Sequence, residues 1–404
     1  MKYDFTSLLD RRGMDAVAVE PWEESPYRKG VTLREGCDPI PMWIADMSFP
    51  VAPPIIEALQ KRVAHPSFGY FRTRQAYYDA IIRWQEKRNG VVGLLPEHIG
   101  YENGVLGGVA TALQVLCSAG ESVLVHAPTY VGFTNTLKRS GYNIVHSELR
   151  KDEAGVYRMD YEDMDRKLRE NRIHAAIFCS PHNPTGRVWE RWEIEKAMEV
   201  YAANDVTVIS DEIWSDLTMP GYSHIPTQSV SEDARNRTVA LYAPSKTFNL
   251  AGLIGSYHII YNKALNDRVC RQSSLCGYNE MNVLSMHALI GGYSAEGEEW
   301  LEELRQVLAG NIDCAVSYIR THFAGVTVDR PQGTYLLLPD CGGWCRAHGV
   351  ELDEMLRRGY EAGVYWQDGR PFFRPDSVRM NLALPLSRVQ EALARLDRFV
   401  FNGD

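Results

Sequence analysis

Residues 175–186 read AAIFCSPHNPTG, residues 206–214 read VTVISDEIW, and residues 238–249 read TVALYAPSKTFN; these three stretches decide the fold. Each begins with a short apolar run and ends in a turn that carries polar side chains. Short apolar runs bounded by turn residues are typical of strands that are buried on both faces of a sheet. The stretches therefore predict three strands of one buried sheet, each followed by a polar turn.

The same short apolar runs recur along the middle of the chain, with longer amphipathic stretches between several of them. Helix-like patterns lie at Met159–Glu170 and Arg191–Asn204. This alternation predicts an α/β domain with a parallel or mixed sheet that helices cover on both sides. The predicted strands are Ser122–His126, Asn143–His146, Ala175–Cys179, Val206–Ser210, Thr238–Tyr242 and Gly255–Ile260.

The last part of the chain has a different pattern, which predicts a second, smaller α+β domain. It starts with a long amphipathic helix at Glu296–Arg320. We expect residues 46–290 to form the large domain and residues 291–404 to form the small one, while residues 1–45 wrap onto the small domain or onto a partner chain. The other predicted elements are strands at Thr327–Asp329, Gly333–Leu338 and Ser377–Leu382 and helices near Leu352–Ala362 and Ser387–Phe401.

Composition excludes several classes of protein. The chain has 404 residues, and 43 Lys and Arg against 52 Asp and Glu give a formal net charge of −9. This acidic balance argues against a nucleic-acid-binding protein, which normally has a basic excess. Because the sequence contains no apolar run of signal-peptide or membrane-span length, we expect a cytoplasmic protein.

The eight cysteines are scattered over a long chain, which does not predict a disulfide framework. Cys341 and Cys345, followed by His348, form the one cluster. A zinc site needs a fourth ligand at workable spacing, and none is nearby in the sequence. We therefore expect free thiols and no metal.

Three polar residues follow the apolar runs of the opening stretches, where ligands bind in open α/β sheets. Asn183 lies in a turn made rigid by two prolines and a glycine, Asp211 directly follows a buried strand, and Lys246 lies in a turn with apolar neighbours. Interpretations without a catalytic role remain open: Asn183 as a capping residue, Asp211 as a helix N-cap or salt-bridge partner, and Lys246 as a surface lysine whose amine reaches solvent. Taken together, an amine nucleophile, a carboxylate and an amide donor are the groups that pyridoxal 5′-phosphate requires.

At this point the sequence resembles a known family. The motifs SPHNPTG (180–186), SDEIW (210–214) and PSKTFNLAG (244–252) are similar in order and spacing to those of fold-type I pyridoxal-phosphate enzymes of the aspartate aminotransferase superfamily. More narrowly, the chain resembles the MalY/PatB-type cystathionine β-lyase (C–S lyase) branch over nearly its whole length. Further matching motifs are PMWIADMSF (41–49), FGY (68–70), APTY (127–130), PQGTY (331–335) and VRMN (378–381).

The resemblance implies a fold and a set of roles. It implies a large cofactor domain with a mixed, mostly parallel seven-stranded sheet, a small α+β domain, and a homodimer with shared active sites. Lys246 would bind the cofactor covalently and move the Cα proton, with Tyr130 stacked on the ring as a second acid/base. The other implied roles are Asp211 at the pyridine nitrogen, Asn183 at the phenolic oxygen, Val105, Leu106 and Ser245 at the phosphate, Tyr70 at the phosphate of the neighbouring subunit, and Arg379 and Ala45 at the substrate.

The chain departs from the family pattern at several positions. Trp214 stands where these lyases usually have His and aminotransferases usually have Tyr, so it would either donate its N–H to the cofactor's phenolic oxygen or only pack there. The other departures are Ala243 for a common Ser, Ile254 for a phosphate-binding Arg of many aminotransferases, and Ser48 for an acid. These changes leave the cofactor expectation intact and bear on the substrate.

Three functions follow as hypotheses. The leading one is β-elimination from cystathionine or a related sulfur amino acid, which yields a thiol, pyruvate and ammonia. The second is an aminotransferase that uses the same residues, and the third is a regulatory or scaffold protein in which catalysis is secondary. The two enzyme hypotheses belong to amino-acid metabolism, with a small-molecule amino acid as substrate, and we expect neither nucleic acid nor a membrane as a partner.

Overall fold

The computed structural model describes residues 1–20, 30–275 and 279–402. It divides into two compact units, and each is described separately below. The larger unit comprises residues 51–183 and 187–302, and the smaller one comprises residues 1–50, 184–186 and 303–404. Part of the N-terminal segment, residues 21–29, lies outside the described residues, as does Cys276.

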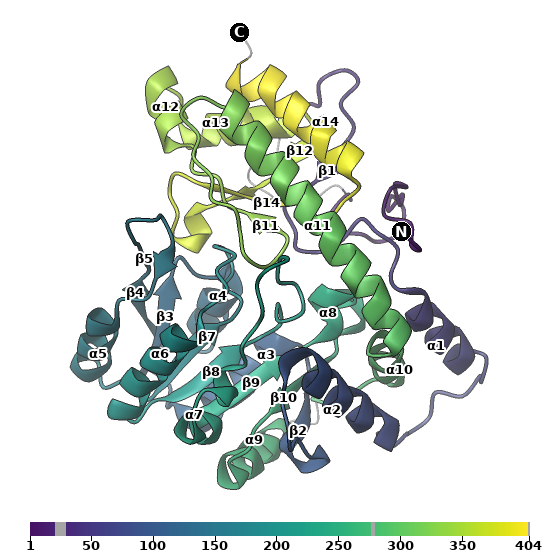
Figure 1. Cartoon of the computed structure of the whole chain (residues 1–404), viewed down its shortest axis with the longest axis vertical. Coiled ribbons are helices and arrows are strands. Elements are labelled where there is room, and N and C mark those ends of the chain that lie inside the picture. The colour runs from purple at the N-terminus through teal and green to yellow at the C-terminus, as the bar shows by residue number, and fades with distance from the viewer. Residues whose placement is uncertain (21–29, 276–278, 403–404) are drawn as a thin grey trace. The chain divides into compact units, whose positions relative to one another are not determined.

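A seven-stranded sheet forms the centre of the larger unit, as the sequence predicts (Figure 1). Its strand order is β2-β10-β9-β8-β7-β3-β4. The neighbours from β9 to β4 run parallel, whereas β10 is antiparallel to both β9 and β2. The strands are β2 (Ile99–Glu102), β3 (Ser122–Ala127), β4 (Asn143–Glu148), β7 (Ala175–Cys179), β8 (Thr207–Asp211), β9 (Thr238–Tyr242) and β10 (Ser256–Ile259).

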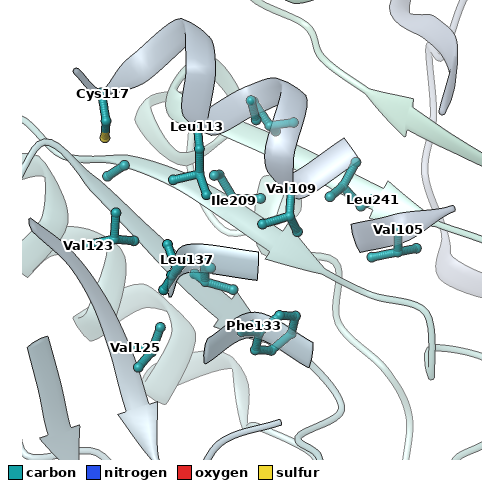
Figure 2. Packing of buried hydrophobic residues seen from close by; sticks show 14 of the residues in the cluster. Val105, Val109, Leu113, Cys117, Val123, Val125, Phe133, Leu137, Ile209 and Leu241 are labelled. Carbon is teal, nitrogen blue, oxygen red and sulfur yellow. The ribbon is translucent and has the colours of Figure 1, made fainter. Parts of the chain in front are cut away.

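Helices cover both faces of this sheet because its side chains alternate between two cores. Val123 and Val125 of β3 enter a core with α3 (Val105–Leu116), α4 (Val131–Arg139) and α9 (Lys263–Leu275). Figure 2 shows these two valines with labelled side chains of α3 and α4. Leu124 enters the opposite core. That second core is completed by α5 (Tyr161–Glu170), α6 (Arg191–Ala203) and α7 (Glu232–Arg237).

One predicted strand differs in character from the others. The run at Asn143–His146 is extended to Glu148 in β4, and it is half exposed rather than buried on both faces. The reason is its position: β4 is an edge strand, so only β3 pairs with it. The remaining elements of this unit are α1 (Pro53–Val63), α2 (Gln75–Asn89), α8 (Pro244–Thr247), α10 (Val283–Gly292) and the hairpin β5 (Arg150–Lys151) and β6 (Tyr157–Arg158).

The smaller unit joins the two ends of the chain. Ile40 and Pro41 of β1 pair in parallel with β12 (Val364–Tyr365), and Asp38 forms ion pairs with Arg388 and Arg395. Its second sheet has β14 (Val378–Asn381) between β11 (Leu336–Leu337) and β13 (Gln367–Asp368). The helices are α12 (Gly342–His348), α13 (Leu352–Glu361), α14 (Leu386–Leu396) with a π-helical end at Asp397–Phe401, and the last part of α11 (Ala295–His322), which starts in the larger unit.

Two strand predictions in the smaller unit are wrong in extent. Residues 327–329 form a single bridge, from Thr327 to Asp340, and the stretch 333–338 keeps only the two residues of β11 as strand. Thr334 has a positive φ of 67°, a conformation that takes the chain out of a strand. Among the described residues, no helix is long and apolar enough to cross a membrane.

Candidate active site

The carboxyl ends of β7, β8 and β9 lie at one edge of the sheet because these strands are parallel neighbours. Asp211 is the last residue of β8 and lies on the same face as Ile209, which belongs to the core beneath α3. Asp211 is paired with Cys179, the last residue of β7, and its carbonyl accepts a hydrogen bond from Ser180 N at 2.9 Å. Asn183 is 4% exposed in the turn that follows. The structure therefore brings the predicted carboxylate and the predicted amide to one edge.

Asp211 is a buried carboxylate with little compensation. Its Oδ1 accepts a hydrogen bond from Ile213 N at 3.0 Å. Burial raises the pKa of Asp211 to about 7, against the smaller opposing effects of that hydrogen bond and of the charge on Lys246. A cation placed beside this carboxylate would hold it ionised.

Lys246 lies in α8, one helical turn that follows β9 directly. Two hydrogen bonds hold this turn in place. Thr247 Oγ1 donates to Asp216 Oδ2 at 2.8 Å, and Leu250 N donates to Ser245 O at 3.0 Å. Lys246 Nζ lies 5.8 Å from the centre of the Trp214 ring, and Trp214 is 2% exposed. Sequence patterns predicted a turn here, and the helical conformation presents Lys246 at the edge where Asp211 ends its strand.

The amino end of α3 lies on the face of the sheet toward which Asp211 points. Gly104 is its N-cap with φ of 78°, a conformation that suits glycine and leaves the N–H groups of Val105 and Leu106 at the start of a twelve-residue helix. Such helix starts bind phosphate groups. Tyr130 caps α4 next to them, and a Cβ on Gly132 would lie 2.3 Å from its ring and 3.0 Å from Leu106.

The smaller unit holds the two residues expected at the substrate. Arg379 of β14 is 3% exposed, and its Nη2 donates to Trp43 O at 3.1 Å while its guanidinium lies 4.6 Å from the Phe372 ring. Tyr335 Oη donates to Ala45 O at 3.1 Å. These bonds tie Trp43 to β14, which carries Arg379, and Ala45 to Tyr335 just before β11.

The turn of the SPHNPTG motif ends in the smaller unit. Gly186 O accepts hydrogen bonds from Gln332 N and Gly333 N, both at 2.9 Å. Gly186 has φ of 68°, and a Cβ there would lie 2.3 Å from Pro331 Cβ. Glycine is therefore required at this position by both conformation and space.

Among the predicted site residues of the larger unit, Tyr70 is the one that is exposed. It lies between α1 and α2 and is fully exposed, as are large parts of Phe68 and Phe71 beside it. No set of three or more His, Cys, Asp or Glu that could hold a metal occurs in the part of the chain that the structure describes. His348 Nδ1 instead contacts Trp344 O at 2.9 Å, within its own helix.

Sequence reasoning missed several residues that support the site, of which Asp216 is buried. Asp216 also accepts from Trp84 Nε1 at 3.0 Å and pairs with Arg88 Nε at 3.2 Å. Asn279 holds the loop before α3, because its Oδ1 accepts from Asn103 N at 2.6 Å. A signal existed in one case: Glu212 follows Asp211 in the sequence, and two consecutive acids after a buried strand need partners.

A buried histidine supports the same loop before α3. His258 Nδ1 lies 2.7 Å from Glu102 Oε1, and Asn279 Nδ2 donates to Glu102 Oε2 at 3.0 Å. Burial alone would lower the pKa of His258, but its hydrogen bonds with Cys270 and Glu102 raise it to about 9. The charged form of this pair fixes Glu102 next to Asn103 and the start of α3.

Comparisons with known proteins place the chain in a family. The model of the family "Aminotransferase class I and II" matches residues 40–396, so the chain belongs to that family. The chain is 32% identical to the cystathionine β-lyase PatB of Bacillus subtilis over 396 residues, which cover 97% of this chain and 98% of PatB. The family predicted from the sequence motifs is thereby confirmed.

Two further relatives show the range of the family. The crystal structure of cystalysin from Treponema denticola, which contains pyridoxal 5′-phosphate, matches with a TM-score of 0.89 and 28% identity over 98% of both chains. An aspartate aminotransferase of Bacillus sp. (strain YM-2) is 26% identical over 77% of this chain and 76% of its own. Lyases and aminotransferases thus both occur among the proteins that this chain is similar to.

Proposed function

We propose that the protein is a pyridoxal-phosphate-dependent carbon–sulfur lyase that carries out β-elimination on cystathionine or a related sulfur amino acid. The observation that carries the proposal is the edge of the large sheet, where Lys246, Asp211 and Asn183 follow three adjacent parallel strands. Similarity to PatB over almost the full length supports the reaction type. The place of such a reaction is amino-acid metabolism.

The residues of the larger unit fit the cofactor. Burial raises the pKa of Asp211, so a protonated pyridine nitrogen placed beside it would stabilise its ionised form. The amino end of α3 after Gly104, with Ser245 close to Lys246 in the chain, would hold the phosphate. Asn183 would donate to the phenolic oxygen, and Tyr130 would pack against the ring.

Different residues of this chain would carry out different steps of the elimination. The bound cofactor withdraws electrons from the substrate Cα. Lys246 would remove the Cα proton, and Tyr130, at the start of α4, would serve as a second acid/base. The Cβ–S bond breaks, the thiol leaves with a proton, and water converts the remaining aminoacrylate into pyruvate and ammonia.

Arg379 and the 43–45 segment would bind the substrate carboxylate. A guanidinium suits a carboxylate because its two N–H groups match both oxygens. The burial of Arg379 and its hydrogen bond to Trp43 O hold the guanidinium in one orientation. The backbone of Ala45, tied by Tyr335, would complete the binding site.

The second candidate function is an aminotransferase, and the specific observation in its favour is the similarity to an aspartate aminotransferase. Product analysis separates the two. Purified protein with pyridoxal 5′-phosphate and cystathionine is expected to release pyruvate and free thiol in equal amounts without any keto acid. Activity that depends strictly on an added keto acid would contradict the lyase and support the aminotransferase.

We also propose that two copies of the chain share their active sites through Tyr70. The support is the full exposure of Tyr70, next to exposed Phe68 and Phe71, in a chain segment without regular structure. A tyrosine that serves the neighbouring copy has no reason to be buried in its own.

Subunit complementation tests this arrangement. The Tyr70→Ala and Lys246→Ala variants are each expected to be nearly inactive, and an equimolar mixture of the two is expected to regain up to about one quarter of wild-type activity, all of it from the mixed dimer. One of its two sites would then carry both changes and the other neither, and random mixing puts half of the chains in mixed dimers. Mixed samples that stay as inactive as the separate variants would show that Tyr70 serves its own subunit.

A further inference from the structure

A buried cluster lies behind Asp211, on the opposite face of the sheet. Its centre is Glu212, which is fully buried and accepts four hydrogen bonds. The donors are Tyr242 Oη at 2.5 Å, His224 Nε2 at 2.6 Å, Ser210 Oγ at 2.9 Å and Thr227 N at 3.0 Å. None of these five residues has a role in the proposed reaction.

These four donors satisfy an ionised carboxylate. Burial opposes ionisation of Glu212, but His224 and the other hydrogen-bond donors outweigh it and hold the pKa of Glu212 below its ordinary value. The donors come from separate parts of the larger unit: β8 itself, β9, and the segment 224–227 before α7. A charged acceptor with four donors is rigid, since moving it would break several strong bonds at once.

The rigidity of Glu212 extends to Asp211 through the backbone. Glu212 N donates to Leu241 O at 2.9 Å, and Ile213 N donates to Asp211 Oδ1 at 3.0 Å. The peptide that joins the two acids is therefore held by β9 on one side and by the Glu212 cluster on the other. Asp211 points to the α3 face because Glu212 is anchored on the opposite one.

We propose that Glu212, anchored by His224 and Tyr242, is a positioning residue that holds the Asp211 carboxylate toward the pyridine nitrogen and so sets how tightly the chain binds pyridoxal 5′-phosphate. The inference rests on the proposed function, because that function assigns Asp211 to the cofactor. It goes further by adding three residues outside the reacting centre.

Electrostatics add a second reason for the anchor. Glu212 and Asp211 are consecutive buried acids, and the charge of Glu212 contributes to raising the pKa of Asp211, after burial as the main cause. The four hydrogen-bond donors around Glu212 partly offset its negative charge and so reduce the effect of that charge on Asp211. Removing a donor would both loosen Asp211 and favour its protonated form, which binds a pyridinium more weakly.

The experiment measures cofactor affinity rather than activity. Apo-protein carrying His224→Ala is titrated with pyridoxal 5′-phosphate, and the quenching of tryptophan fluorescence gives Kd. We expect Kd to rise about tenfold or more, since a hydrogen bond to a charged group is among the stronger ones in a protein and its loss frees Glu212 to move. His224→Gln keeps a donor in place of Nε2 and is expected to stay within about threefold of wild type.

A matched control is available in the same unit. His126 is also buried, and its Nε2 lies 3.1 Å from Tyr201 Oη, but it belongs to β3 and is separated from β8 by β7. His126→Ala is expected to lower Tm as His224→Ala does, yet to leave Kd within about twofold. An equal Kd in both alanine variants, or a His224→Gln Kd as high as that of His224→Ala, would overturn the inference.

A second variant tests the same role in case His224→Ala does not fold. Tyr242→Phe removes one donor to Glu212 while keeping the ring packed, and we expect a Kd about three- to tenfold above wild type. An unchanged Kd in Tyr242→Phe would overturn the role of that donor even if His224→Ala does not fold. If wild-type apo-protein does not bind the cofactor at all, the proposed function fails, which this titration distinguishes from failure of the positioning role alone.

Discussion

Lys246→Ala is expected to abolish the visible absorbance band of the bound cofactor and to lower kcat on the order of 10³-fold or more. The band depends on the covalent bond between the lysine amine and the cofactor aldehyde, and no amine remains at this position in the variant. In the proposed reaction Lys246 moves the Cα proton, so its loss would lower the rate. Absorbance spectra before and after borohydride, together with steady-state rates on cystathionine, provide the measurement.

The matched control for this variant is Lys263→Ala. Lys263 is on the surface at the start of α9, where it pairs with Asp267 at 2.7 Å, so its removal tests loss of a lysine without loss of the site. The control is expected to keep both the band and the rate. A Lys246→Ala protein that retained a borohydride-sensitive band would place the covalent bond on another lysine and refute the assignment.

Asp211→Asn is expected to lower kcat about 10²- to 10³-fold and at the same time to stabilise the cofactor-free protein above pH 7. The amide has the same shape but no charge, so it does not keep the pyridine nitrogen protonated, and the ring withdraws electrons less strongly. In the cofactor-free chain the same change removes a buried charge. A substitution that stabilises the fold while it disables the site is the sign of a functional carboxylate.

The pH dependence of stability follows from the sign of the shift. Burial raises the folded pKa of Asp211 from 3.8 to about 7, so between these values the folded chain binds more protons than the unfolded chain. The contribution of Asp211 to the free energy of unfolding therefore falls as pH rises, by up to about 1.4 kcal/mol for each pH unit. Thermal unfolding of cofactor-free wild type and Asp211→Asn across pH 4.5–8 measures this.

The difference in Tm between the two proteins is expected to widen in favour of the variant as pH rises, and to shrink when pyridoxal 5′-phosphate is added to wild type. In the proposed site the pyridinium of the cofactor would place a cation beside the buried carboxylate, and a bound ligand stabilises the protein that binds it. A constant difference across the pH range would mean that Asp211 does not titrate in this interval.

The strands of the large sheet could be predicted because local sequence and tertiary environment agree there. Ala175–Cys179 and Thr238–Tyr242 are apolar throughout, and each ends at a polar turn, so their bounds match β7 and β9. The two-residue strands β1, β12 and β13 of the smaller unit carry no such signal. Their pairing is set by distant partners, as in Ile40 beside Val364, and so lies beyond any pattern within a window of sequence.

The sequence by itself determined which reactive groups the chain carries, in what order, and to which family it belongs. Asn183, Asp211 and Lys246 each follow an apolar run, and that local arrangement is enough to place all three at the ends of strands. Their chemistry could be argued from residue type because an amine, a carboxylate and an amide have few joint uses.

Only the tertiary structure decided which residues support these groups. The bond between Thr247 and Asp216, the hold of Asn279 on Asn103, and the cluster of His224 around Glu212 join residues far apart in the chain. Such contacts depend on strand register and on the conformation of turns, and a shift of one residue in β8 would exchange the faces of Asp211 and Glu212. The physical reason is that a side chain's type is local, whereas its partners are chosen by the packing of the whole sheet.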